Sequence, residues 1–254
     1  MEKEDSIMKL GKKEPRHDAR TLQLLNYLSP STLPTIPAQK DWSSKVPEWK
    51  MLCNDTLGCC TISGAMHMAM DWTANASTEF IPKDSDIIKA YSAVSGYDPA
   101  TGENDNGAVE LDVLNYWRRH GIASHKIYAY ASLEPRNTAL IKAAVYLFGG
   151  VYIGLALPLS AQNQSIWDIS EHGFRGDGRP GSWGGHAVNC VAFDKDYITC
   201  VTWGALKKMS WAFWSHYCDE SYAVLSKDFT DNKGIAPNSI NWAALQSDLK
   251  QVVH

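Results

Sequence analysis

The chain has 254 residues, of which 44% are hydrophobic and 20% are charged. This composition excludes a disordered protein and suits one large domain or two closely packed lobes. The formal net charge of −4 gives no basic surface for nucleic acid, and no stretch has the roughly 18 apolar residues of a membrane-spanning helix. The first residues lack the apolar core of a secretory signal, so we expect a cytoplasmic protein with neither a membrane nor a nucleic acid as partner.

Residues 1–36 are polar at first and then punctuated by prolines, which predicts an arm with one short helix over 21–28. The basic residues of this arm indicate a solvated segment. Its position ahead of the rest suggests that it lies over the surface or clasps a neighbouring molecule. We assign residues 37–254 to one domain.

Helical patterns dominate the first part of that domain. From Cys60 onward, apolar residues recur at steps of three and four, and further helices are predicted over 84–94, 111–120 and 140–148. Residues 98–112 hold several acids and glycines, but their spacing does not fit a calcium-binding loop. We interpret that stretch as a surface turn.

The period changes to two after Gly150. Alternating residues predict a strand at 153–157, and further strands are expected over 187–193, 197–203 and 222–225. Helices first and strands afterwards predict an α+β fold. The helical half would cover about 50–148 and the sheet half about 150–228.

Two positions indicate nucleophilic chemistry. Cys60 opens a predicted helix, whose N-terminus lowers the pKa of a thiol, and His186 follows 126 positions later (186 − 60). A thiolate beside an imidazole attacks a carbonyl carbon and forms an acyl-enzyme, which water or an amine then resolves. Cys59 cannot face the same site as its neighbour, so we expect it to be buried.

The six cysteines are expected to be reduced thiols. The sequence has no C-x-x-C pair and no H-x-x-x-H pair, so we predict no metal site. No cofactor is expected either.

Several segments, in this order, resemble segments of the papain-like (C1-type) cysteine peptidases over about residues 33–226. They are Leu33-Pro34 with Asp41-Trp42; residues 54–60, on the Q-G-x-C-G-S-C-W box; residues 114–117, 121–122 and 128–130; residues 141–153; Gly185-His186-Ala187-Val188, on "NHAV"; and Trp203-Gly204 with Glu220-Ser221-Tyr222. The resemblance is greatest to uncharacterised papain-like proteins of phages and prophages, which implies that this protein would be phage-encoded and virion-associated. It implies two lobes, one helical and one an antiparallel sheet or barrel, with the active cleft between them.

The resemblance also implies roles for single residues. Cys60 would be the nucleophile and His186 the general base, while the Asn54 amide would donate to the oxyanion. Gly58 falls on the box glycine. Gly185 gives a peptide backbone room to approach, and Trp203 would cover the edge of the imidazole.

This sequence also departs from the family pattern. The tryptophan after the nucleophile is Thr61, and the asparagine that orients the histidine is missing. Thr202 offers a hydroxyl in place of that asparagine. The first 40 residues lack the long inhibitory pro-segment of the lysosomal enzymes.

Three functions follow from these observations. The first is a thiol-dependent hydrolase that cleaves amide bonds, peptide or isopeptide, with a peptide or protein as substrate. The second is a papain-like scaffold that binds without cutting, which the missing asparagine favours. The third is an acyltransferase that uses the same two residues, and the sequence does not separate it from the first. Oligomeric state and side-chain preference stay open.

Overall fold

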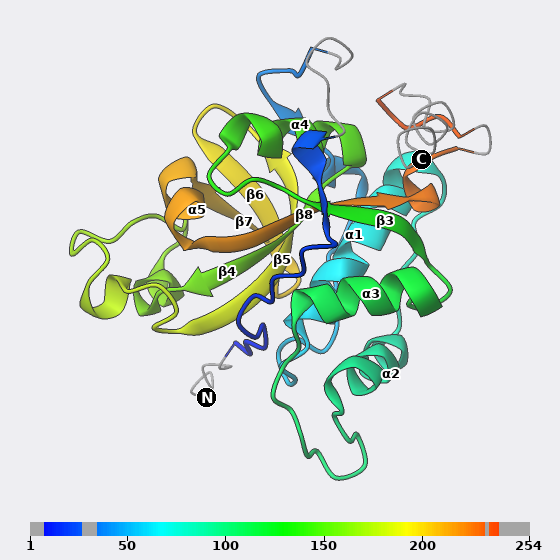
Figure 1. Ribbon diagram of the computed structural model, residues 1–254, viewed down its shortest axis with the longest axis horizontal. Helices are drawn as coiled ribbons and strands as arrows, with labels where there is room; N and C mark the ends of the chain where they lie inside the picture. The colour runs from blue at the N-terminus through cyan, green and yellow to red at the C-terminus, as the bar shows by residue number, and fades with distance from the viewer. Residues whose placement is uncertain (1–7, 27–34, 232–233, 239–254) are drawn as a thin grey trace.

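The helices come early in the chain and most of the strands come late (Figure 1). The computed structural model describes residues 8–26, 35–231 and 234–238. The helices are α1 (Cys60–Ala76), α2 (Asp84–Ser95), α3 (Glu110–His120), α4 (Thr138–Phe148) and α5 (Trp211–Tyr217). The strands are β1 (Leu22–Gln23), β2 (Lys40–Asp41), β3 (Ile127–Ser132), β4 (Val151–Leu157), β5 (Gly184–Phe193), β6 (Tyr197–Thr202), β7 (Ala205–Ser210) and β8 (Cys218–Ser226).

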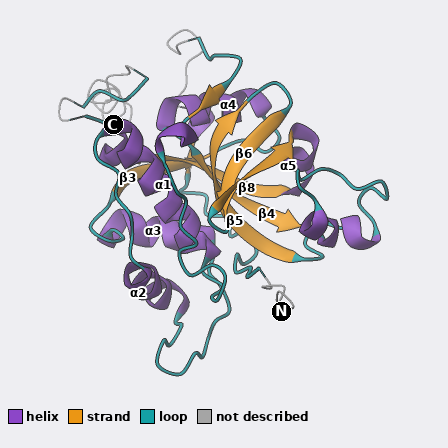
Figure 2. Ribbon diagram, turned by 180° about the vertical axis from the view of Figure 1, so that it is seen from behind, coloured by secondary structure: helices purple, strands orange, loops and turns teal. Residues whose placement is uncertain are grey.

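The strands form one open sheet in the order β1-β3-β8-β4-β5-β6-β7, and β2 pairs with β5. Every pairing is antiparallel except that of β1 with β3. The helices α1, α2 and α3 gather on one side of the sheet, which Figure 2 shows from behind. The predicted α+β class, with a helical part followed by a sheet part, is therefore confirmed.

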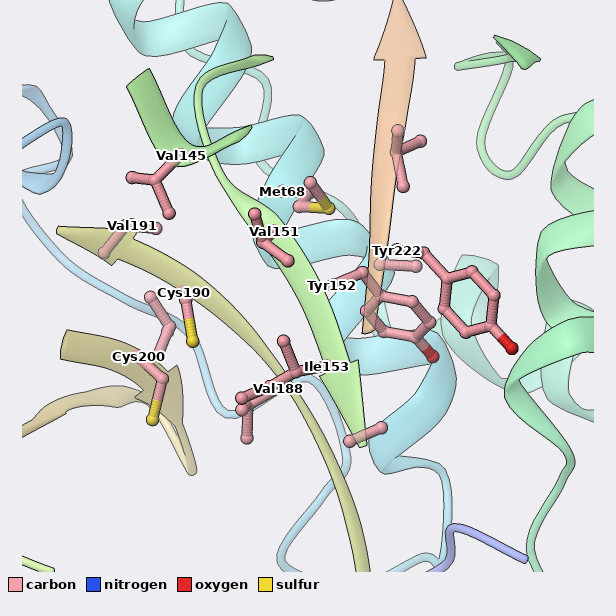
Figure 3. Close-up of a cluster of buried hydrophobic side chains, with 14 of the residues drawn as sticks. Met68, Val145, Val151, Tyr152, Ile153, Val188, Cys190, Val191, Cys200 and Tyr222 are labelled. Carbon is pink, nitrogen blue, oxygen red and sulfur yellow. The ribbon is translucent and has the colours of Figure 1, made fainter. Parts of the chain in front are cut away.

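Helix α1 packs directly against the sheet. Its residues from Cys60 to Thr73 are all buried, including polar ones such as His67 and Asp71. Gly64 permits the close approach, since a Cβ there would lie 3.2 Å from the carbonyl oxygen of Ala187 on β5. Met68 of this helix joins the side chains of β4 and β5 in the core (Figure 3). The first turn of α1 is thereby fixed beside the start of β5.

The fold corrects two of the predictions. The helix expected over 21–28 is wrong: β1 and a 3-10 turn at Leu24–Asn26 stand there, and residues 27–28 lie outside the described part. An isolated helix of two turns is marginal, and pairing with β3 replaces it.

The boundary near residue 148 is also displaced, because β3 pairs with β8 and α4 contacts β4, β5 and β8. Only α1, α2 and α3 form the helical part. Strand β7 and helix α5 were not predicted. Among the helices of the described residues, none combines the length and apolar character needed to cross a bilayer.

Candidate active site

Cys60 is the first residue of α1 and is fully buried. The thiol of the preceding Cys59 points elsewhere, toward the carbonyl of Leu52 at 3.5 Å. Burial raises the pKa of Cys60 to about 12, although backbone hydrogen bonds from Ala187 and Gly11 act in the opposite direction. While it is buried in this way, the Cys60 sulfur is a neutral thiol, and the backbone amides of Ala187 and Gly11 face it.

His186 lies near the start of β5 and is also fully buried. Its Nε2 is 2.6 Å from Oγ1 of Thr202, and its ring stacks on the indole of Trp203 with centroids 4.3 Å apart. Its Nδ1 has no hydrogen-bond partner among the described residues. Burial lowers the pKa of His186 to about 3, so the ring is neutral at pH 7. The free nitrogen is the one available to exchange a proton.

Asn54 is buried before the first turn of α1. Its Nδ2 donates to the carbonyl oxygen of Leu57 at 3.3 Å and to that of Lys9, also at 3.3 Å. The indole Nε1 of Trp203 donates to the same Lys9 oxygen at 3.1 Å. Two of the predicted site residues thus bind one backbone carbonyl of the N-terminal arm.

Residues 9–13, which we call the blocking segment, fill the groove between Ala108 and Gly185. The Lys12 N–H donates to the Gly185 oxygen at 3.0 Å, the Lys13 N–H donates to the Ala108 oxygen at 2.9 Å, and the Ala108 N–H donates to the Gly11 oxygen at 2.8 Å. In Figure 1 this part of the chain, in dark blue, passes between the sheet and α3. The groove therefore holds an extended peptide by its backbone.

Glycine is required where the blocking segment and the groove touch. A Cβ on Gly11 would lie 1.8 Å from the Gly58 oxygen, and a Cβ on Gly185 would lie 2.1 Å from the Lys12 oxygen. Both distances are far shorter than any real contact. The predicted binding residues Gly58 and Gly185 thus line the groove from its two sides.

The blocking segment passes Cys60 with its backbone paired to neighbouring residues. Lys12 bridges Ala108 in the parallel sense. The thiol of Cys60 faces the amide of Gly11, whose carbonyl is already bound by Ala108. The segment therefore occupies the space beside the sulfur, and the Gly11 carbonyl oxygen is turned toward Ala108.

Four charged residues that lie beside the site were not predicted as site residues from the sequence. Lys12 is buried, and its ammonium group lies 2.9 Å from Asp219 Oδ2 and 3.2 Å from Glu220 Oε1. Glu110, the first residue of α3, is buried nearby. In the sequence Lys12 has the appearance of a solvated charge in a basic arm. Glu110 has that of an acidic residue in the first turn of a helix, where a negative charge is favourable. Of these four residues, only Glu220 is marked by its sequence context, because it lies next to the apolar run of β8.

Each of the seven predicted site residues lies beside residues 9–12 or beside another predicted site residue. Cys60, His186 and Thr202 lie at the adjoining ends of α1, β5 and β6. Asn54 and Trp203 bind Lys9, and Gly58 and Gly185 contact the segment. Their catalytic roles stay predictions. Among the described residues there is no cluster of His, Cys, Asp and Glu that could hold a metal ion.

No protein-family model and no curated protein matches this chain. Solved structures do match. Xylellain, a cysteine protease from Xylella fastidiosa, has a TM-score of 0.66 at 15% identity over 86% of this chain and 96% of its own. Digestive procathepsin L 3 of Tenebrio molitor reaches 0.61 at 14% identity, over 86% of this chain and 76% of its own.

The cysteine protease and lectin-like domains of Cwp84 from Clostridium difficile reach a TM-score of 0.60 at 10% identity. That match covers 88% of this chain and 57% of the Cwp84 chain. At these identities the likeness shows the fold. The chain has a papain-like fold.

Proposed function

We propose that this protein is a thiol-dependent hydrolase that cleaves amide bonds in peptides, and that the blocking segment keeps it latent. The observation that carries the proposal is the arrangement of Cys60 and His186 beside a groove that binds an extended peptide. The papain-like fold supports it, because the solved structures that share this fold include cysteine proteases.

Departure of the blocking segment would start the reaction. Water would then reach the site, the pKa of Cys60 would fall, and that of His186 would rise, since burial causes both shifts. His186 would accept the thiol proton at Nδ1, and its Nε2–H would donate to Thr202 Oγ1. The resulting thiolate and imidazolium are the reactive pair.

The thiolate would attack a substrate carbonyl carbon. Negative charge would develop on the carbonyl oxygen, where the Asn54 amide and the N-terminus of α1 supply donors. The imidazolium would then return its proton to the departing amine, leaving a thioester on Cys60. Water, deprotonated by His186, would release the acid and restore the thiol.

The full-length Gly11→Val variant tests this function, because valine cannot fit 1.8 Å from the Gly58 oxygen. The variant is incubated with a mixture of unfolded polypeptides, and new termini are identified by mass spectrometry. We expect cleavage by Gly11→Val and none by Gly11→Val/Cys60→Ala.

Two other results identify the alternatives. Products condensed with added glycinamide, formed in preference to free acids, would make the protein an acyltransferase. Peptide binding with no new termini, in a variant whose blocking segment is released, would make it a binding scaffold.

A further inference from the structure

The side chain of Lys12 is buried in a cluster of three carboxylates, Glu110, Asp219 and Glu220, which we call the carboxylate pocket. The ammonium group donates to Asp219 Oδ2 at 2.9 Å and to the Lys13 carbonyl oxygen at 3.2 Å, and it forms an ion pair with Glu220 Oε1 at 3.2 Å. The Lys12 side chain is 1% exposed. A lysine carried by the blocking segment thus acts as a ligand of this pocket.

The sheet is shaped to admit the lysine stem. Gly154 of β4 lies under it, and a Cβ at this position would be 2.0 Å from Lys12 Cε. Gly154 pairs directly with Glu220 across β4 and β8. The Tyr222 hydroxyl fixes the Glu220 carboxylate through a 2.9 Å hydrogen bond. The pocket therefore has room for the lysine stem beside Gly154 and an acidic end at Asp219 and Glu220.

The pocket holds three acidic side chains around one cation. Glu110 is fully buried, and neither of its carboxylate oxygens has a hydrogen-bond partner among the described residues. Burial raises the pKa of Glu110 and Glu220, and it lowers that of Lys12, but the carboxylate charges raise the Lys12 pKa by more. Burial favours the protonated forms of these acids, whereas the ammonium group favours the carboxylates, so the pocket suits a cationic side chain.

We propose that the carboxylate pocket is the specificity site for substrates and takes a lysine or arginine side chain of the peptide. This inference rests on the proposed function. Lys12 follows Gly11, whose amide faces the Cys60 sulfur, so the selected side chain lies within one or two residues of the bond attacked. A cavity of about 360 Å³ adjoins Asp219 and Glu220 on the side of Arg16.

Peptide binding to full-length Gly11→Val/Lys12→Ala/Cys60→Ala tests the assignment without any need for catalysis. These changes expel the blocking segment, empty the pocket and prevent cleavage. The probes are acetylated hexapeptides of alanine and glycine in which one position, scanned in turn, is lysine, arginine, norleucine or glutamate. At the preferred position we expect lysine and arginine to bind at least about tenfold more tightly than norleucine, by calorimetry at low salt.

A pocket variant locates the preference. Asp219→Asn, in the same background, should reduce the ratio of lysine to norleucine affinity several-fold. Asp196→Asn, which neutralises an exposed acid outside the groove, should leave it unchanged. The proposal would be overturned by equal affinities for lysine and norleucine at every position, or by no binding of any peptide. This comparison uses the background variant alone, so it does not depend on whether Asp219→Asn folds.

Restoring Cys60 separates this proposal from the proposed function. If lysine peptides bind selectively but none is cut, the pocket assignment stands and the hydrolase assignment fails. If peptides are cut at equal rates whatever side chain they carry, the hydrolase assignment stands and the pocket assignment fails.

Discussion

The imidazole of His186 is held on two sides by residues that follow one another in the chain. Thr202 binds its Nε2, and Trp203 stacks on its face with 12° between the ring planes. The φ of Trp203 is +46°, a strained value for a bulky residue, and it places the indole over the histidine. We infer that Thr202 takes the orienting part that an amide plays elsewhere, with a single oxygen that accepts from the protonated ring.

Loss of the Thr202 hydroxyl should therefore slow the chemistry. In the Gly11→Val background, Thr202→Val should lower kcat/KM for peptide cleavage about tenfold, the effect of one hydrogen bond to a group that becomes charged. Thr202→Ser keeps the oxygen and is the matched control. Equal kcat/KM for the valine and serine variants would show that the hydroxyl does not orient the ring.

His67 provides a separate pH effect on stability. It is buried in α1 with Nε2 2.7 Å from the Lys50 oxygen, and burial lowers its pKa to about 4. Between the unfolded value near 6.5 and about 4 the unfolded chain binds the extra proton, so this histidine makes stability fall as the pH falls.

The variant His67→Gln should lack that contribution. Between pH 7 and pH 5 its free energy of unfolding, from urea titration, should fall by about 2 kcal/mol less than that of the wild type. His120→Gln, at an exposed position, should behave as the wild type. Parallel pH profiles for the wild type and His67→Gln would contradict this account.

At the scale of whole elements, the blocking segment joins the helical part to the sheet. It bonds to Ala108 ahead of α3 and to Gly185 on β5, and Lys12 reaches Asp219 on β8. Those contacts depend on Gly11, whose neighbours leave no room for a side chain. One substitution there should free the segment while the sheet keeps its own pairings.

Hydrogen exchange measures that release. In Gly11→Val the amides of Lys12, Lys13 and Ala108 should lose most of their protection, while amides in β4 and β5 keep theirs. Met8→Val changes an exposed residue just before the segment and should exchange as the wild type does. Retained protection at Lys12 in Gly11→Val would mean that the groove accommodates the valine.

At the scale of the whole molecule, local patterns predicted local structure. The periods of three to four and of two placed α2, α3, α4, β4, β5 and β6 close to their observed bounds, whereas only 222–225 of β8 was expected. The α+β class followed from the order of these elements. Strand β3 was not recognised because its partner β8 lies far along the chain, and pairing, more than its own pattern, makes it a strand.

The site shows the same limit. Cys60 and His186 stood out because their residue types and neighbours indicate chemistry. The contact between Lys12 and Asp219 spans 207 positions, and nothing in the local sequence of either residue indicates it. The charges of the arm predicted a solvated segment, but Lys12 is buried against carboxylates that only the fold brings together.

The central claim, a Cys60–His186 pair held latent by the blocking segment, is tested most directly by alkylation of Cys60 with iodoacetamide as a function of pH, read by mass spectrometry. In the wild type we expect very slow labelling at pH 7, since Cys60 is buried and its pKa is about 12. In Gly11→Val labelling should be fast below pH 7 and slow again in Gly11→Val/His186→Ala. Equal rates for the wild type and Gly11→Val, or labelling of Gly11→Val only near the pKa of an ordinary thiol, about 8.5, would contradict the account.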